Sequence, residues 1–277
     1  ERKTVGGPGP PETDRGMARP LQGNELLARW QQNRDANICN IFDPNLSEQE
    51  RGDLFDTEDE AAQEIYAWAI PDERALRICE AFAPIVEIGA GAGYWARLLR
   101  DRGVDVAAYD KSVGDDARAA GVGARPWTEV RRGGAEALKD HTASTLLLCY
   151  PDDHEDGGET KPLSVECLEA FEGDLIIHVG ELFGDSLSVS MEGQETPDDI
   201  WPWGRSTDPR FQAQLATTFH KILQVPLPCW ANARDTLTVW RRSATAVVSG
   251  DRYAHIPREE RLSLELACPA TAHLLAE

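Results

Sequence analysis

The sequence predicts an α/β protein built on a doubly wound, mostly parallel sheet of seven strands that ends in an antiparallel β-hairpin. A β-branched run at residues 85–88 leads into a glycine-rich turn at 89–93. A helical pattern and a second extended run at 104–109 follow, and together these segments make a βαβ unit with parallel strands. Later extended runs alternate with helical patterns, and the last two follow one another without a helix, as in a hairpin at a sheet edge.

The segments before the sheet differ in composition. Residues 1–23 are rich in proline and glycine and poor in apolar side chains, so we expect a disordered tail. Residues 24–82 are predicted to form an N-terminal helical cover. Within it, Thr57 and Glu60 have the spacing of a capping box at a helix start. Pro71 ends that helix and suits the first turn of the next one.

The sheet domain is predicted to span residues 83–243 and to be followed by a C-terminal extension at 244–277. Beyond the βαβ unit, helical patterns occupy residues 163–171 and 212–218. The extension contains a predicted helix at 259–266 and has no clear place in the sheet. The further strands are expected at 128–131, 145–149, 174–179, 220–225 and 235–240.

The composition excludes several classes of protein. With 277 residues, 41% hydrophobic and 27% charged, the chain is neither a collagen-like fibre nor a bundle of membrane helices. Its net charge of −20 repels phosphate backbones, which makes nucleic acid an unfavourable partner. Its six cysteines show neither a CxxC pair nor zinc-ligand spacing, so we expect no disulfide framework and no metal. The longest apolar run, residues 146–150, is too short for a bilayer, and we expect a cytoplasmic protein. The sequence does not indicate the oligomeric state.

The glycine-rich turn predicts a ligand site. It follows the first strand, and open α/β sheets bind ligands at the carboxyl ends of their strands. Gly89, Gly91 and Gly93 lack Cβ atoms, so the backbone there can turn sharply and approach a ligand closely. Tyr94 stands where the dinucleotide pattern GxGxxG requires its third glycine, which argues against NAD(P).

Two carboxylates flank this turn. Glu87 lies two residues before the first glycine, where a buried acid would repel a pyrophosphate but favour a cationic ligand. Asp110 ends the second strand and can accept hydrogen bonds from two ribose hydroxyls. The pair therefore predicts a ligand that carries both a positive charge and a ribose.

Residues 86–93 and Asp110 resemble the first two motifs of class I S-adenosylmethionine-dependent methyltransferases, and the order of elements over residues 60–243 is similar as well. The resemblance implies a Rossmann-like fold, S-adenosylmethionine as cofactor, Glu87 near the methionine amino group and Asp110 at the ribose. Residues 130–135 resemble the family's adenine-contacting segment, although Gly134 replaces its common Asp. The cofactor-binding residues that it implies are Glu87, Gly89, Ala90, Gly91, Gly93, Tyr94, Asp110, Lys111, Gly134, Ala135 and Cys149.

The segment after the fourth strand is where this family places the methyl acceptor. It resembles the [Asp/Asn/Ser]-Pro-Pro-[Tyr/Phe] motif of amino-group methyltransferases, but only Pro151 matches, so amine specificity is not carried over. We expect Tyr150, Asp152 and His154 to be catalytic, because they can orient or deprotonate an acceptor. The alternative is a polar surface turn.

These observations predict a methyltransferase that moves the methyl group of S-adenosylmethionine in line to a small-molecule acceptor. A long loop at 182–208, with Trp201 and Trp203, is expected to cover the site. Two alternatives stay open, a catalytically silent scaffold that binds the same cofactor and an NAD(P)-dependent oxidoreductase.

Overall fold

A computed structural model describes residues 23–35, 44–50, 60–113, 126–152, 162–182, 204, 206–230, 233–244, 256–263 and 266–275. These residues contain a seven-stranded sheet of order β3-β2-β1-β4-β5-β7-β6. β1 to β5 run parallel, whereas β7 is antiparallel to both β5 and β6. The predicted fold class, including the terminal hairpin, is confirmed. The strands are β1 (Ile85–Ile88), β2 (Val106–Asp110), β3 (Arg131–Arg132), β4 (Thr145–Cys149), β5 (Leu175–Gly180), β6 (Phe219–Pro226) and β7 (Thr236–Arg242).

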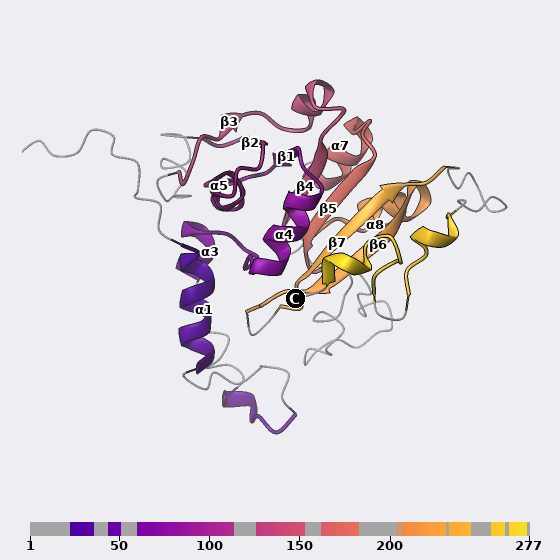
Figure 1. The fold of residues 1–277 in the computed structure, drawn as a ribbon. Helices are drawn as coiled ribbons and strands as arrows, with labels where there is room; N and C mark the ends of the chain where they lie inside the picture. The colour runs from indigo at the N-terminus through magenta and orange to yellow at the C-terminus, as the bar shows by residue number, and fades with distance from the viewer. Residues whose placement is uncertain are drawn as a thin grey trace, which may run out of the picture.

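Helices cover both faces of the sheet (Figure 1). The alternation of side chains along each strand divides the core in two: Ile85 and Leu147 face the cluster that includes α4 and α5, and Val86 and Leu146 face the one that includes α7 and α8. The direction of the strand order reverses between β1 and β4, which makes a topological switch point there. The helices are α1 (Glu25–Asp35), α3 (Glu60–Ile65), α4 (Glu73–Ala81), α5 (Tyr94–Asp101), α7 (Leu163–Ala170) and α8 (Pro209–Thr218), with 3-10 turns η1 (Ala135–Asp140), η4 (Arg258–Glu260) and η5 (Ala272–Leu275).

The start of α4 differs from the prediction. Asp72 is the N-cap, and its side chain accepts a hydrogen bond from Ala75 N at 2.7 Å. Pro71 therefore lies before the cap and not in the first turn, because the Asp carboxylate is the better partner for the unpaired amides. The predicted capping box includes Thr57, which lies outside the described residues.

Two predicted elements are wrong in extent. The strand expected at 128–131 begins only at Arg131, because the Arg100 guanidinium bonds Thr128 Oγ1 at 2.8 Å and the Glu129 carbonyl at 2.7 Å. The helix expected at 259–266 is the single turn η4 in its described part. Beyond that turn the chain joins the sheet edge.

The C-terminal segment contacts the outermost strand β6. Glu260 bonds His220 Nε2 at 2.7 Å and Arg241 Nε at 3.0 Å, which draws the segment away from a helical path. Ala267 then forms an antiparallel bridge with Leu223. The extension thus covers part of an otherwise unpaired sheet edge.

Among the described residues, no helix is long and apolar enough to cross a membrane.

Candidate functional site

The glycine turn after β1 has three residues in the left-handed region. Gly89, Gly91 and Gly93 have φ of 77°, 54° and 78°. A Cβ on Gly93 would lie 2.7 Å from Val130 Cγ2, and one on Gly89 would lie 3.0 Å from Leu163 Cδ2, whereas one on Gly91 would meet nothing within 4 Å. The outer glycines therefore serve internal packing, and the open space is at Gly91.

Asp110 at the end of β2 shapes this turn. Its Oδ2 accepts a hydrogen bond from Gly91 N at 2.8 Å, and its Oδ1 accepts one from Ser112 N at 2.8 Å. Each carboxylate oxygen has a second lone pair, so the same group can also accept from ligand hydroxyls. The structure thus brings the predicted ribose acid and the glycine turn together.

Glu87 lies on the other side of the turn and is nearly sealed from solvent. Its side chain is 2% exposed, and its Oε2 atom has no hydrogen-bond partner among the described residues. Burial raises the pKa of Glu87 to about 8. The nearby charge of Asp110 also raises this pKa, whereas the charge of Arg100 and a backbone hydrogen bond from Ala96 lower it. A buried oxygen without a partner is costly, and a ligand ammonium group would supply the missing donor and charge.

Cys149, the last residue of β4, lies within electrostatic range of Glu87. Burial and then the Glu87 charge raise the pKa of the thiol well above its usual value, and Asp235 adds to this shift. The thiol is therefore a neutral part of the site floor and no nucleophile. It also connects two acids, since Glu87 and Asp235 both act on it.

Residues 130–135, the segment that resembles the family's adenine-contacting segment, adjoin the end of β2. Gly133 N donates to the Asp110 carbonyl at 3.1 Å, and Arg132 Nη1 donates to the Lys111 carbonyl at 3.1 Å. Gly134 N is held by Glu136 Oε1 at 2.8 Å. Gly133 and Lys111 thus lie beside Asp110, and the predicted adenine contacts Gly134 and Ala135 follow Gly133 in the chain, Ala135 being buried.

Tyr94 differs from its predicted role as far as its side chain is concerned. The ring is 1% exposed, its hydroxyl donates to Asn24 Oδ1 at 3.1 Å, and it accepts from Leu26 N at 3.0 Å. The phenol anchors α1 and is committed to the protein, so only the Tyr94 backbone, at the start of α5, can meet a ligand.

Three indole N–H groups hold the segment between α3 and α4. Trp127 donates to the Ile65 carbonyl at 2.7 Å, Trp230 to the Trp68 carbonyl at 3.0 Å, and Trp95 to the Ala69 carbonyl at 3.2 Å. The Ala69 backbone also donates to the Cys149 thiol. This segment, residues 65–70, therefore contacts the end of β4 at Cys149.

Tyr150, the first residue after β4, is tied to residues that the sequence did not single out as site residues. Its hydroxyl donates to Asp235 Oδ1 at 2.5 Å, and its ring stacks on Trp68 with a centroid distance of 5.8 Å. Asp235 belongs to no motif identified in the sequence. It lies 85 residues beyond Tyr150 in the chain, directly before β7. Only the pairing of β5 with β7 brings it to this edge.

Asp152 has a structural role that the sequence left as an alternative. Its carboxylate accepts from Ser164 N at 3.3 Å, from the Ser164 hydroxyl, and from Asp208 N at 3.2 Å. It therefore satisfies amides at the starts of α7 and α8. Its expected catalytic role has no support in these contacts. His154, Trp201 and Trp203 lie outside the described residues.

Metal ligands do not gather in this part of the chain. Within the described ranges, no group of three or more His, Cys, Asp or Glu side chains is placed to hold an ion. The residues around Glu87, Gly91 and Asp110 suit an organic ligand with a cationic group and hydroxyls.

Comparison with known proteins gives likeness of fold only. No protein-family model matches the chain, and no curated protein matches it. Among solved structures, the 23S rRNA methyltransferase ErmE is similar at 18% identity and TM-score 0.36, over 65% of this chain and 72% of that chain. The glycopeptide N-methyltransferase MtfA, complexed with sinefungin, is similar at 14% identity and TM-score 0.38, over 61% and 84%. Magnesium protoporphyrin IX methyltransferase (ChlM) from Synechocystis PCC 6803, with bound SAH, is similar at 13% identity and TM-score 0.40, over 79% and 98%. At these values no residue role is taken from them.

Proposed function

We propose that this chain binds S-adenosylmethionine at the carboxyl ends of β1 and β2 and transfers its methyl group to a small-molecule acceptor. The observation that carries the proposal is the Glu87 carboxyl, buried with one oxygen unpartnered and with a pKa raised by burial. An amino-acid ammonium group meets both needs, since it donates hydrogen bonds and favours the ionised acid.

The neighbouring residues fit the rest of such a ligand. Gly91 leaves open space beside its amide, and Asp110 retains lone pairs for ribose hydroxyls. Gly134 and Ala135 offer a small-residue surface for a base. When bound, the sulfonium supplies an electrophilic methyl group, and the protein's contribution is to hold an acceptor in line with it and to exclude water.

The two other functions are less well supported. An NAD(P) pyrophosphate at this turn would lie near the Glu87 carboxyl, which could then stay neutral, but the pyrophosphate would offer no donor to the unpartnered Oε2 atom. One observation favours a silent scaffold: the Asp152 carboxylate, expected to be catalytic, is hydrogen-bonded to the backbone amides of Ser164 and Asp208. Cofactor binding is common to the scaffold and the enzyme, so only methyl transfer separates them.

Calorimetry tests the cofactor. Below pH 8, ligand-free Glu87 holds a proton that a bound ammonium group should expel. Titration of S-adenosylhomocysteine at pH 6.5, in buffers with different ionisation enthalpies, should therefore show close to one proton released per ligand. Glu87→Gln should release none, and the exposed Glu80→Gln on α4 should behave as wild type. Tight NAD(P) binding without a response to S-adenosylhomocysteine would refute the proposal.

A methyl-transfer screen tests the enzyme. Isotope-labelled S-adenosylmethionine incubated with pools of small metabolites should label at least one pool. Cofactor binding with no labelled product in any pool would favour the scaffold.

A further inference from the structure

Tyr150 is held in a conformation that its residue type disfavours. Its φ is 46°, in the left-handed region that glycine occupies most readily. The hydroxyl is bonded to Asp235, the ring lies on Trp68, and a Cβ on Gly180 would lie only 3.0 Å from Tyr150 Cδ2. Contacts from three segments thus fix this ring, and such over-determined backbone strain is characteristic of functional sites.

The ring lies at the switch point of the sheet, next to the cofactor site proposed above. Tyr150 follows β4, which pairs with β1, the strand that carries Glu87. Leu147 is the partner of Glu87 in the ladder between β1 and β4, and Cys149 lies two residues further along β4, directly before Tyr150. A group that contacts the Tyr150 hydroxyl would therefore be close to the reacting end of a ligand bound at Glu87.

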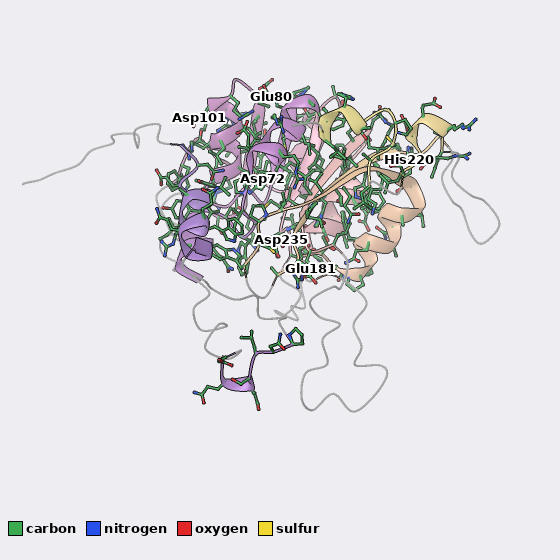
Figure 2. All side chains as sticks on the ribbon, turned by 60° about the horizontal axis from the view of Figure 1, so that its bottom comes forward. Asp72, Glu80, Asp101, Glu181, His220 and Asp235 are labelled. Atoms are coloured by element: carbon green, nitrogen blue, oxygen red, sulfur yellow. The ribbon has the colours of Figure 1, made fainter. Side chains whose placement is uncertain are left out.

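The surroundings of the hydroxyl favour one kind of partner. The phenol donates its hydrogen bond to Asp235, which is 2% exposed, so the phenol oxygen meets a further group as an acceptor. Glu181 is 1% exposed and directly follows β5, one position beyond the Gly180–Thr236 pair, so the antiparallel ladder places it beside Asp235. Figure 2 shows these two acids near each other at one end of the strands.

Trp68 adds an aromatic surface to this edge. Its side chain is 40% exposed, although it is one of the largest apolar side chains of the cover. An indole face beside desolvated carboxylates attracts a cation by its quadrupole as well as by the neighbouring charge. The position thus combines a hydrogen-bond acceptor, two buried carboxyl groups and a partly exposed aromatic ring.

We infer that the acceptor presents an amine, which Tyr150 receives through its hydroxyl oxygen while Asp235 acts as the positioning residue behind it. This rests on the proposed function and on the contacts of Tyr150, not on the motif resemblance of the segment that contains it. The amine arrives as an ammonium group and passes one proton to the Tyr150 oxygen as the phenol proton moves to Asp235. The freed nitrogen lone pair forms the bond to the methyl carbon, the carbon–sulfur bond breaks, and its electron pair leaves with the sulfur. The product is the methylated ammonium ion and a neutral thioether.

A pair of probes that differ only in the head group tests the inference. Benzylamine and benzyl alcohol are titrated into the full chain saturated with S-adenosylhomocysteine, at pH 7 and physiological salt. Benzylamine should bind at least tenfold more tightly than the alcohol, as expected of about one charge-assisted hydrogen bond. Asp235→Asn and Tyr150→Phe should each reduce this ratio by about tenfold. The matched control Asp174→Asn, an exposed acid before β5 at the far end of the sheet, should leave it unchanged.

The ratio of the two affinities is informative because loss of a merely structural contact would weaken the binding of benzylamine and benzyl alcohol alike. An equal affinity for amine and alcohol in the loaded wild type overturns the inference, as does a ratio that survives both substitutions. If Asp235→Asn does not fold, which loss of S-adenosylhomocysteine binding would reveal, Tyr150→Phe decides alone. Failure of the wild type to bind S-adenosylhomocysteine refutes the proposed function instead, and the two failures are thereby distinguished.

Discussion

Replacement of Glu87 by Gln should remove a pH dependence from the stability of the ligand-free protein. Burial raises the pKa of this carboxyl from 4.5 to about 8 in the folded state. Between these values the native protein holds a proton that the unfolded chain has released, so the free energy of unfolding falls as the pH rises. The contribution is fully present below pH 4.5 and is lost as the pH passes 8.

The size of the effect follows from the same shift. One proton difference between the two states corresponds to about 1.4 kcal/mol per pH unit. From pH 5.5 to 7.5, wild type should therefore lose up to about 3 kcal/mol that Glu87→Gln retains, since a neutral amide replaces the neutral acid. Other titrating groups are common to both proteins and cancel in the comparison.

Urea unfolding at the two pH values, followed by far-UV circular dichroism, measures this difference. Glu80→Gln, whose side chain is exposed on α4, controls for the loss of one acid. If wild type and Glu87→Gln lose the same free energy of unfolding between pH 5.5 and 7.5, the folded protein does not hold a proton on Glu87 in this range. The assignment of a cationic ligand to it would then lose its physical basis.

Three further substitutions probe the surroundings of the site. Gly93→Ala should destabilise the fold by about 1–3 kcal/mol, because its Cβ would lie 2.7 Å from Val130 Cγ2 in a left-handed backbone; an unchanged urea midpoint would contradict this packing. Trp127→Phe removes the donor to the Ile65 carbonyl and should cost about 1–2 kcal/mol and speed amide exchange in the cover; unchanged exchange would refute its anchoring role. Asp152→Ala should cost about 1–2 kcal/mol in urea unfolding and leave the affinity for S-adenosylhomocysteine intact; a selective loss of affinity would return Asp152 to the ligand site.

The residues of the proposed cofactor site could largely be predicted from local sequence. A β-branched run, spaced glycines and a second strand ending in Asp110 are contiguous features, and parallel pairing of β1 with β2 suffices to bring them together. The functions of individual glycines were not accessible. Whether a glycine is required by Val130 or Leu163, or faces open space, depends on side chains from distant segments.

The acceptor side was predicted less well, for a related reason. Asp152 was expected in the site because it follows a strand end. Its carboxylate instead accepts hydrogen bonds from Ser164 N at the start of α7 and Asp208 N at the start of α8, which only the tertiary structure brings close. On the cofactor side, Tyr94 was expected at the ligand, but its hydroxyl oxygen accepts a hydrogen bond from Leu26 N in α1, whose position no local pattern specifies. Both residues carry groups suited to ligand binding that the folded chain uses for its own backbone amides.

The local sequence by itself predicted the alternation of strands and helices, the antiparallel hairpin at the end of the sheet and the two acids that flank the glycine turn. These follow from periodicity, turn chemistry and chain direction, all of which act over a few neighbouring residues. What three-dimensional packing alone decided is that Glu87 is buried with one carboxyl oxygen unpartnered among the described residues, and that Tyr150 is paired with Asp235. Burial and pairing of this kind are properties of segments far apart in the chain, because desolvation depends on everything that surrounds a group and not on its neighbours in sequence.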